Sequence, residues 1–198
     1  VWAWGANAYG QLGMGAHDSN SHATPQQVSF ESYSNPVMTA VSAGAYHTLA
    51  LDTAGNVYAW GHNGIRPYGD GRLGGFSGGN YCTDVNPVPE DAAFCVETPN
   101  TSNIPVPMAS IAAGGNFSAA VSRLNGKVYV WGSNDSGQLG NGLIDADGHP
   151  NASEVPGFDN VIGICAGNKH ILALKNDGTV WSWGANESGQ LGLGSMNA

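Results

Sequence analysis

Apolar and polar positions alternate in short stretches along this chain, and the pattern predicts β-hairpins. The stretch 47–51 (HTLAL) reads as an apolar strand, 52–56 as a polar turn containing Gly55, and 57–60 (VYAW) as a returning strand. The same order recurs at 170–183, and between these copies Asn125-Gly126 is a dipeptide favoured in tight hairpins. Apolar residues do not recur at helical spacing, so the sequence predicts an all-β fold.

The predicted returning strands carry aromatic residues at alternate positions. Because side chains alternate between the two faces of a strand, each aromatic pair lies on one face, and Val with Ala or Ser lies on the other. Small residues facing large ones favour tightly stacked sheets. The pairs are Trp2 and Trp4, Tyr58 and Trp60, Tyr129 and Trp131, and Trp181 and Trp183.

Two motifs recur in a fixed phase and identify the chain as a tandem repeat. A Trp-Gly-x-Asn motif followed by a Gly-Gln-Leu-Gly-like loop begins at Trp4, Trp60, Trp131 and Trp183. A strand of small residues ends in Gly44, Gly114 and Gly167, each 16 or 17 residues before its Trp. The second copy has extra residues within its loop, from about 62 to 103.

These residues resemble the regulator of chromosome condensation repeat, which combines an Ala-Gly strand, a His-Thr-Leu-Ala-Leu-like strand, a Trp-Gly strand and a Gly-Gln-Leu-Gly loop. The resemblance implies β-propeller blades, usually seven to a ring, of which this chain holds about three to four. From the residues alone, a propeller and a solenoid are both possible. We expect a partial blade at 1–40, a blade at 41–110 with the insertion 62–103, a blade at 111–163 and an incomplete blade at 164–198. The ring would be partial, or completed by association with further copies.

Composition narrows the classes of partner. The chain has 41% apolar residues, 30 glycines and a formal net charge of −9, with only six Lys and Arg. Nucleic-acid binding depends on basic residues that displace counterions from phosphates, so we expect no nucleic-acid partner. The apolar runs are too short to span a membrane, so we expect no membrane span.

Cys82 and Cys95 lie within the insertion and predict a disulfide that closes a long loop. Such a bond would stabilise the fold by roughly 3 kcal/mol and would place the protein outside the cell, at the cell surface or in a periplasm. Two free thiols are the alternative. The two Cys with His62 could also bind zinc, although their spacing matches no tight zinc pattern. Cys165 takes the position of Ser42 and Ala112, so we expect a buried packing residue.

The insertion also carries the residue types that are common at contact hot spots. Aromatic and cationic side chains gather there, so we interpret it as a candidate partner-binding loop. The alternative is a loop that only packs over a blade edge. The candidate residues are Arg66, Tyr68, Arg72, Phe76 and Tyr81.

No set of residues predicts catalysis, a cofactor or a metal site. His47 and His170 occupy a repeat position that holds Phe117 in the third copy, so we interpret them as structural, like the repeated Trp residues. Asp145 and Asp147 could be calcium ligands, but a complete loop pattern is missing, and a solvated turn is favoured. We therefore predict that the protein is not an enzyme.

Function follows from surfaces and loops because a fold does not determine function. We predict a non-enzymatic protein-interaction or assembly module, extracellular or at the cell surface. Its partner would be a protein or further copies of itself, and a glycan is possible. The alternatives are guanine-nucleotide exchange on a small GTPase, or inhibition of an enzyme as a secreted protein.

Overall fold

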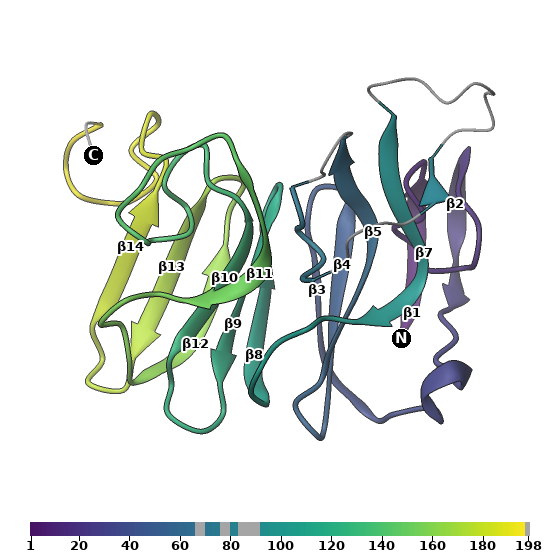
Figure 1. Cartoon of the computed structure of the whole chain (residues 1–198), viewed down its shortest axis with the longest axis horizontal. Helices are drawn as coiled ribbons and strands as arrows, with labels where there is room; N and C mark the ends of the chain where they lie inside the picture. Colours follow the sequence, from purple (N-terminus) through teal and green to yellow (C-terminus); the bar gives the residue numbers. More distant parts are fainter. Residues whose placement is uncertain (66–69, 76–79, 83–91, 197–198) are drawn as a thin grey trace.

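The protein consists of four antiparallel sheets that follow one another in chain order. The structure is a computed structural model, and it describes residues 1–65, 70–75, 80–82 and 92–196. Figure 1 shows the sheets side by side, from β1 and β2 at one end to β12–β14 at the other. Helical structure in the described residues is limited to one 3-10 turn, η1 (Glu31–Tyr33). The fold is all-β, as predicted.

The second and third sheets each contain a complete four-stranded blade. The second sheet has the order β3 (Met38–Ala43), β4 (His47–Asp52), β5 (Val57–Ile65), β7 (Ala93–Thr101) and β6 (Asn80–Tyr81). The third has the order β8 (Met108–Ala113), β9 (Phe117–Ser122), β10 (Val128–Ser133) and β11 (Gly148–Glu154). The range 62–103 therefore includes the outer strand β7 as well as the extra residues.

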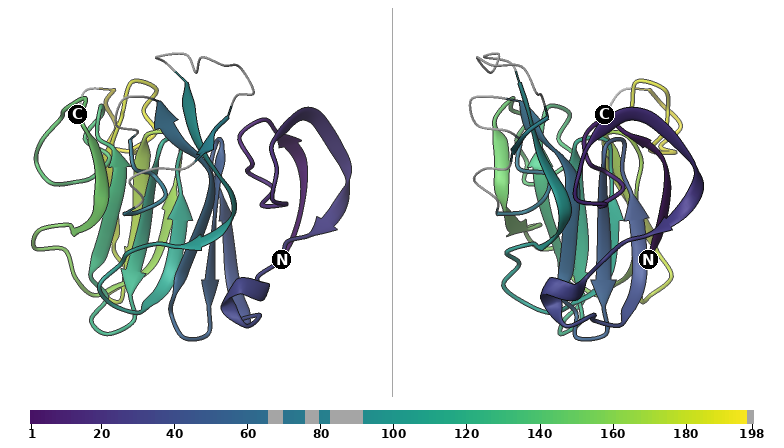
Figure 2. Two further views of the ribbon diagram at one scale, coloured as in Figure 1. Left: turned by 45° about the vertical axis from the view of Figure 1, so that its right-hand side comes forward. Right: turned by 90° about the vertical axis from the view of Figure 1, so that its right-hand side faces the viewer.

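The two terminal sheets contain fewer strands. The first sheet consists of β1 (Trp2–Asn7) and β2 (Asp18–Gln27), which are the equivalents of β10 and β11. The fourth consists of β12 (Val161–Ala166), β13 (His170–Lys175) and β14 (Val180–Gly184), the equivalents of β8, β9 and β10. Figure 2 shows from two further sides that β1 and β2 lie at one end of the array.

Apolar side chains fill the spaces between adjacent sheets. Leu49 and Leu51 of the second sheet pack with Met108 and Trp131 of the third. Phe117 and Val130 of the third sheet pack in the same way with Ile171 of the fourth. Each sheet thus buries its apolar face only by lying against a neighbour, which is the arrangement of propeller blades.

A tryptophan joins each pair of neighbouring sheets. The indole N–H of Trp60 donates to the backbone oxygen of Gln11 in the preceding loop (2.9 Å). Trp131 donates to the oxygen of Arg72 (2.8 Å) and Trp183 to that of Gln138 (3.0 Å). Trp4, on the first sheet, is 60% exposed. The repeated Gly-Gln-Leu-Gly loop therefore provides the acceptor for the next sheet.

The glycines at the ends of β3, β8 and β12 are explained by a ring that lies against each of them. A Cβ atom on Gly44 would lie 2.4 Å from Cε1 of His47, and one on Gly114 would lie 2.1 Å from Phe117. Gly167 meets His170 in the same way, at 2.0 Å. A side chain at any of these positions would displace the ring that follows it.

The prediction that Cys165 is buried is wrong, because its side chain is exposed. The equivalent Ser42 faces the next sheet, where its hydroxyl accepts from the backbone N–H of Ala113 (2.9 Å). No sheet of the described residues covers the fourth sheet on that side. Burial at this repeat position therefore depends on the presence of a neighbouring sheet.

Candidate binding cavity on the loop face

One end of the array carries the repeated Gly-Gln-Leu-Gly-like loops, and we call it the loop face. It is formed by the short turns β3–β4, β8–β9 and β12–β13 and by the loops that follow β1, β5, β10 and β14. The hairpin turns β4–β5, β9–β10 and β13–β14 lie at the opposite end (Figure 1). Loops that a rigid β scaffold holds together are a common place for binding sites.

Loops of the first three sheets line an open cavity of about 470 Å³ on this face. Aromatic and charged side chains from the first two sheets form one part of its lining, and small or polar residues from the third sheet form much of the rest. The lining residues are Tyr9, Tyr46, His62, Gly64, Asp70, Arg72, Asn116, Ser133, Ala146 and Gly148.

Three rings form the aromatic part of the lining. The Tyr9 ring lies edge-to-face against Tyr46 (centroids 5.1 Å apart) and against His62 (4.5 Å). Nδ1 of His62 accepts from the backbone N–H of Gly64 (3.4 Å). Burial, and next the positive charge of Arg72, lower the pKa of His62 to about 4. His62 is therefore a neutral ring near pH 7.

Arg72 is a buried cation that is paired with its neighbour Asp70. Its Nε donates to Oδ1 of Asp70 (2.8 Å), and Nη2 donates to Oδ2. Only 3% of the Arg72 side chain is exposed, against 19% for Asp70. Among the described residues, Nη1 has no hydrogen-bond acceptor. An unsatisfied buried donor costs about 1–3 kcal/mol, so an acceptor that reached Nη1 would be stabilising.

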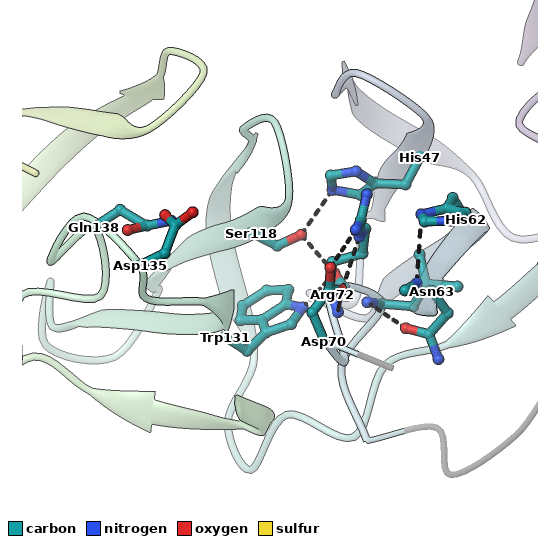
Figure 3. Close-up of polar contacts among 11 residues, drawn as sticks. His47, His62, Asn63, Asp70, Arg72, Ser118, Trp131, Asp135 and Gln138 are labelled. Carbon is teal, nitrogen blue, oxygen red and sulfur yellow. Dashed lines mark hydrogen bonds and ion pairs between the residues drawn. The ribbon is translucent and has the colours of Figure 1, made fainter. Parts of the chain in front are cut away.

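The third sheet holds the backbone of Arg72 in place. Its carbonyl oxygen accepts from the Trp131 indole and from the hydroxyl of Ser118 (2.7 Å). Because the Ser118 hydroxyl donates its proton to that carbonyl, its oxygen accepts a hydrogen bond from Nε2–H of His47 (2.9 Å). Figure 3 shows this chain of contacts between the second and third sheets.

His47 is neutral in the folded protein. Burial, followed by the charges of Arg72 and His62, lowers its pKa to about 3. Its proton is on Nε2, and Nδ1 has no partner among the described residues. The Arg72 and Asp70 charges therefore balance each other, and the surrounding histidines add no charge.

The structure places only part of the predicted partner-binding loop. Arg72 lines the cavity, but it is 2% exposed and its guanidinium is paired, so it is not a freely exposed contact residue. Arg66, Tyr68 and Phe76 lie outside the described residues. Tyr81 belongs to strand β6, and its side chain is also outside the description.

A disulfide joins Cys82, which directly follows β6, to Cys95 of β7, with the two Cα atoms 5.5 Å apart. Cys95 also pairs in register with His62 at the end of β5. The bond therefore attaches Cys82 to the strand position that pairs with His62, a residue of the cavity lining. Because both sulfurs are used, the zinc alternative with His62 is wrong.

Comparison of the repeat copies provides a signal for the cavity that sequence reasoning missed. Tyr9 stands where later copies have Ser136 and Ser188, and Tyr46 stands where they have Asn116 and Lys169. Likewise, His62 replaces Ala or Ser, and Arg72 replaces the Gln of the repeated loop. Positions at which the early copies differ from the repeat thus converge on one cavity.

The acidic loop at 145–149 has a structural role that also recurs. Asp145 accepts from Nδ2 of Asn134 (2.9 Å) and contacts Nε2 of His149 (2.8 Å). The first sheet has the same arrangement, with Asp18 between Asn7 and His22. Across the part of the chain that the structure describes, no group of three or more His, Cys, Asp or Glu residues could hold a metal ion.

Comparisons with known proteins agree with the repeat structure. A family model described as the regulator of chromosome condensation (RCC1) repeat matches residues 1–51 and 125–174, and a second model of that description matches 108–138 and 161–190. The chain is 31% identical to the ultraviolet-B receptor UVR8 of Arabidopsis thaliana over 98% of its own length and 39% of the relative's.

Solved propeller structures show the same fold. The human WBSCR16 structure matches the whole chain with a TM-score of 0.75 at 22% identity, over 46% of its own length. Prp20p from Saccharomyces cerevisiae matches 89% of the chain with a TM-score of 0.72 at 23% identity, over 40% of its own length. The chain thus spans less than half the length of these proteins.

Within the described residues, no helix is both long and apolar enough to cross a bilayer.

Proposed function

Because the chain belongs to the regulator of chromosome condensation repeat family, we propose that it is a non-enzymatic protein-interaction module that binds a protein partner with its loop face. Prp20p, which has a similar fold, is described by its binding to Gsp1p and histones. Repeated blades provide a rigid support, and their loops supply the contacts.

This proposal rests on one observation: the residues at which the early copies differ from the repeat line a single cavity. Repeat positions that serve the fold keep their residue types, as at Trp60, Trp131 and Trp183. Where the fold does not require the residue type of the repeat, the side chain can instead contribute to partner binding. Aromatic rings beside a buried Arg are also the residue types that contribute most to protein–protein binding.

The Cys82–Cys95 disulfide supports an extracellular or cell-surface location, with a periplasm as the alternative. Disulfides persist in oxidising compartments and are rare in the reducing cytosol. The test is to lyse source cells directly into an alkylating reagent, which blocks free thiols before they can oxidise, and to analyse the protein by mass spectrometry. A disulfide-linked peptide pair is expected, and two alkylated thiols would contradict this location.

The outer face of the first sheet is a second candidate for a protein-binding surface. Trp2 and Trp4 are 61% and 60% exposed, whereas the equivalent Tyr58 and Trp60 are covered by the preceding sheet. Exposed aromatics of this size suit packing against a further blade, whether it belongs to the same polypeptide or to another copy. Light scattering of the wild type and a Trp2→Ser/Trp4→Ser variant tests this, with dimer expected only for the wild type.

Cross-linking to the partner tests the loop face directly. Lys169 lies in the β12–β13 turn of the loop face, whereas Lys127 and Lys175 lie toward the opposite end. Complexes from a source extract should cross-link through Lys169 and not through the other two lysines. Cross-links confined to Lys127 and Lys175 would contradict the proposal. Accelerated nucleotide release from a purified small GTPase would instead favour the exchange alternative.

A further inference from the structure

We propose that the cavity holds an extended peptide segment of the partner, and that an uncharged carbonyl of this segment accepts a hydrogen bond from the Arg72 guanidinium. This inference rests on the proposed function, because it assigns the ligand of the loop face. It follows from the donors of Arg72, the charge around it and the rings beside it.

The guanidinium has more donors than the folded chain uses. Asp70 accepts from Nε and Nη2, while Nη1 meets no acceptor in the described residues although the side chain is 3% exposed. Folded proteins rarely leave a buried donor unpaired, so the free donor of Arg72 calls for an explanation. An acceptor brought by a ligand would remove this deficit.

The charge balance favours a neutral acceptor over a carboxylate. Asp70 already compensates the charge of Arg72, and neither His47 nor His62 is protonated near pH 7. The whole chain carries a formal charge of −9, and a carboxylate would be repelled as it approached. The carbonyl of a peptide bond accepts hydrogen bonds without this electrostatic cost.

The rings make the cavity suitable for a polypeptide. Tyr9 and Tyr46 meet edge-to-face, and Tyr46 is 48% exposed, so ring surface remains available to apolar side chains. Tyrosine-lined sites commonly bind extended segments, with the ring packing on the chain and polar groups reading its backbone. Nη1 is covered in the free protein, so binding includes a side-chain rearrangement of the kind common at interfaces.

The repeat itself supplies a variant that removes the site and keeps the loop. In the third sheet, Oε1 of Gln138 accepts from the backbone N–H of Ser136 (2.8 Å), which closes the turn without a charged pair. The substitutions Asp70→Ser and Arg72→Gln convert residues 70–74 to Ser-Gly-Gln-Leu-Gly, identical to 136–140 and 188–192. The backbone acceptor for Trp131 is retained.

The experiment uses a random peptide library displayed on phage. It is panned on the whole wild-type protein, and the enriched peptides are then titrated calorimetrically against the wild type and against the Asp70→Ser/Arg72→Gln protein. We expect about tenfold or more weaker binding to the double variant, the effect of losing one hydrogen bond in a desolvated site. Affinity should change little between about 50 and 500 mM salt, because no net charge is neutralised.

Two further variants keep the result interpretable. Tyr46→Asn installs the residue of the third copy on an exposed turn and should also weaken binding, whereas Lys127→Ala removes a cation at the opposite end of the array and should not. Thermal melting of each variant checks its fold. If the double variant does not fold, the Tyr46→Asn result decides the test.

The inference and the proposed function can fail separately. Peptides that bind the double variant as tightly as the wild type would overturn the inference, as would acidic peptides with steep salt dependence or the enrichment of no peptide. None of these results affects Lys169 cross-links to the native partner. Cross-links confined to the opposite end would instead overturn the proposed function.

Discussion

The loops after β5 and β10 share the same backbone contacts but differ in the polar side chains around them. In both loops an Asn side chain accepts from the backbone N–H of a buried Leu, at Asn63 and Leu73 (3.3 Å) and at Asn134 and Leu139 (3.1 Å). Both loops also offer a carbonyl oxygen to the tryptophan of the next sheet. These shared contacts maintain the blade junctions.

The polar groups around these shared contacts differ. In the later loop Gln138 bonds its own turn, and Asp135 forms an ion pair with Lys169 (2.7 Å) that is more than 40% exposed on both sides. In the earlier loop, the ion pair between Arg72 and Asp70 is largely buried beside a cavity. The repeat therefore keeps the groups that join sheets, and the groups that differ between the copies include those that line the cavity.

Removing a junction tryptophan should have the largest effect and should differ between the two loops. Trp131 is completely buried against the earlier loop, so Trp131→Ala should lower the free energy of unfolding by about 3–5 kcal/mol. Trp183, against the later loop, is only partly buried, so Trp183→Ala should cost less. Urea denaturation measures both values. Equal losses would mean that the two junctions are not distinguished by burial.

The disulfide should stabilise the earlier loop alone. Cys82→Ser/Cys95→Ser should lower the free energy of unfolding by roughly 3 kcal/mol, because the bond closes a segment with a separation of 13 residues. Adding reductant to the wild type should have a similar effect in calorimetry, and it should not change the double variant. A reductant effect on the variant would contradict this assignment.

Acid should destabilise the buried polar cluster through His47. The folded pKa of about 3 lies below the ordinary value of 6.5, so in acid the unfolded chain binds a proton that the folded protein does not. Stability should therefore fall as pH drops from about 6.5 toward 3, by about 1.4 kcal/mol per pH unit for this one group.

The matched variant is His47→Phe, because the third sheet holds Phe117 against Gly114 in the same geometry. Its stability should depend less steeply on pH below 6.5, with the remaining slope due in part to His62. Denaturation at several pH values measures the slopes. Parallel curves for wild type and variant would show that His47 becomes protonated in the folded protein.

Removing the exposed ion pair of the later loop should have the smallest effect. Lys169→Ala should change the free energy of unfolding by about 0.2–1 kcal/mol, because exposed ion pairs contribute little in water. Asp70→Ala, in the earlier loop, should cost more because it leaves the Arg72 charge buried and unpaired. The two values, from the same urea titrations, should not be similar.

The residue pattern was sufficient to predict much of the fold. Alternating aromatics and the phase of the Gly and Trp motifs predicted hairpins and stacked sheets, because both depend on local periodicity. The disulfide between Cys82 and Cys95 was also predictable from their spacing within one loop. The exposure of Cys165 was not, because it depends on which sheets are present beside it.

The cavity could not be predicted because its parts come from different sheets. Tyr9 and Tyr46 are 37 positions apart in sequence, and their contact depends on the angle between the first and second sheets. The pairing of Arg72 with Asp70 is local, but the backbone of Arg72 is held by hydrogen bonds from Trp131 and Ser118 of the third sheet. Comparison of the four loops would have identified the positions, though not their proximity.

An NMR measurement of the Arg72 guanidinium tests the proposed peptide site most directly. In a spectrum of protein labelled with ¹⁵N at arginine, the Arg72 side-chain protons should exchange slowly with water, because the group is buried and bonded to Asp70. A bound peptide should shift the Nη1 resonances and slow their exchange further. Rapid exchange in the free protein, or Nη1 resonances that a tightly bound peptide leaves unchanged, would contradict it.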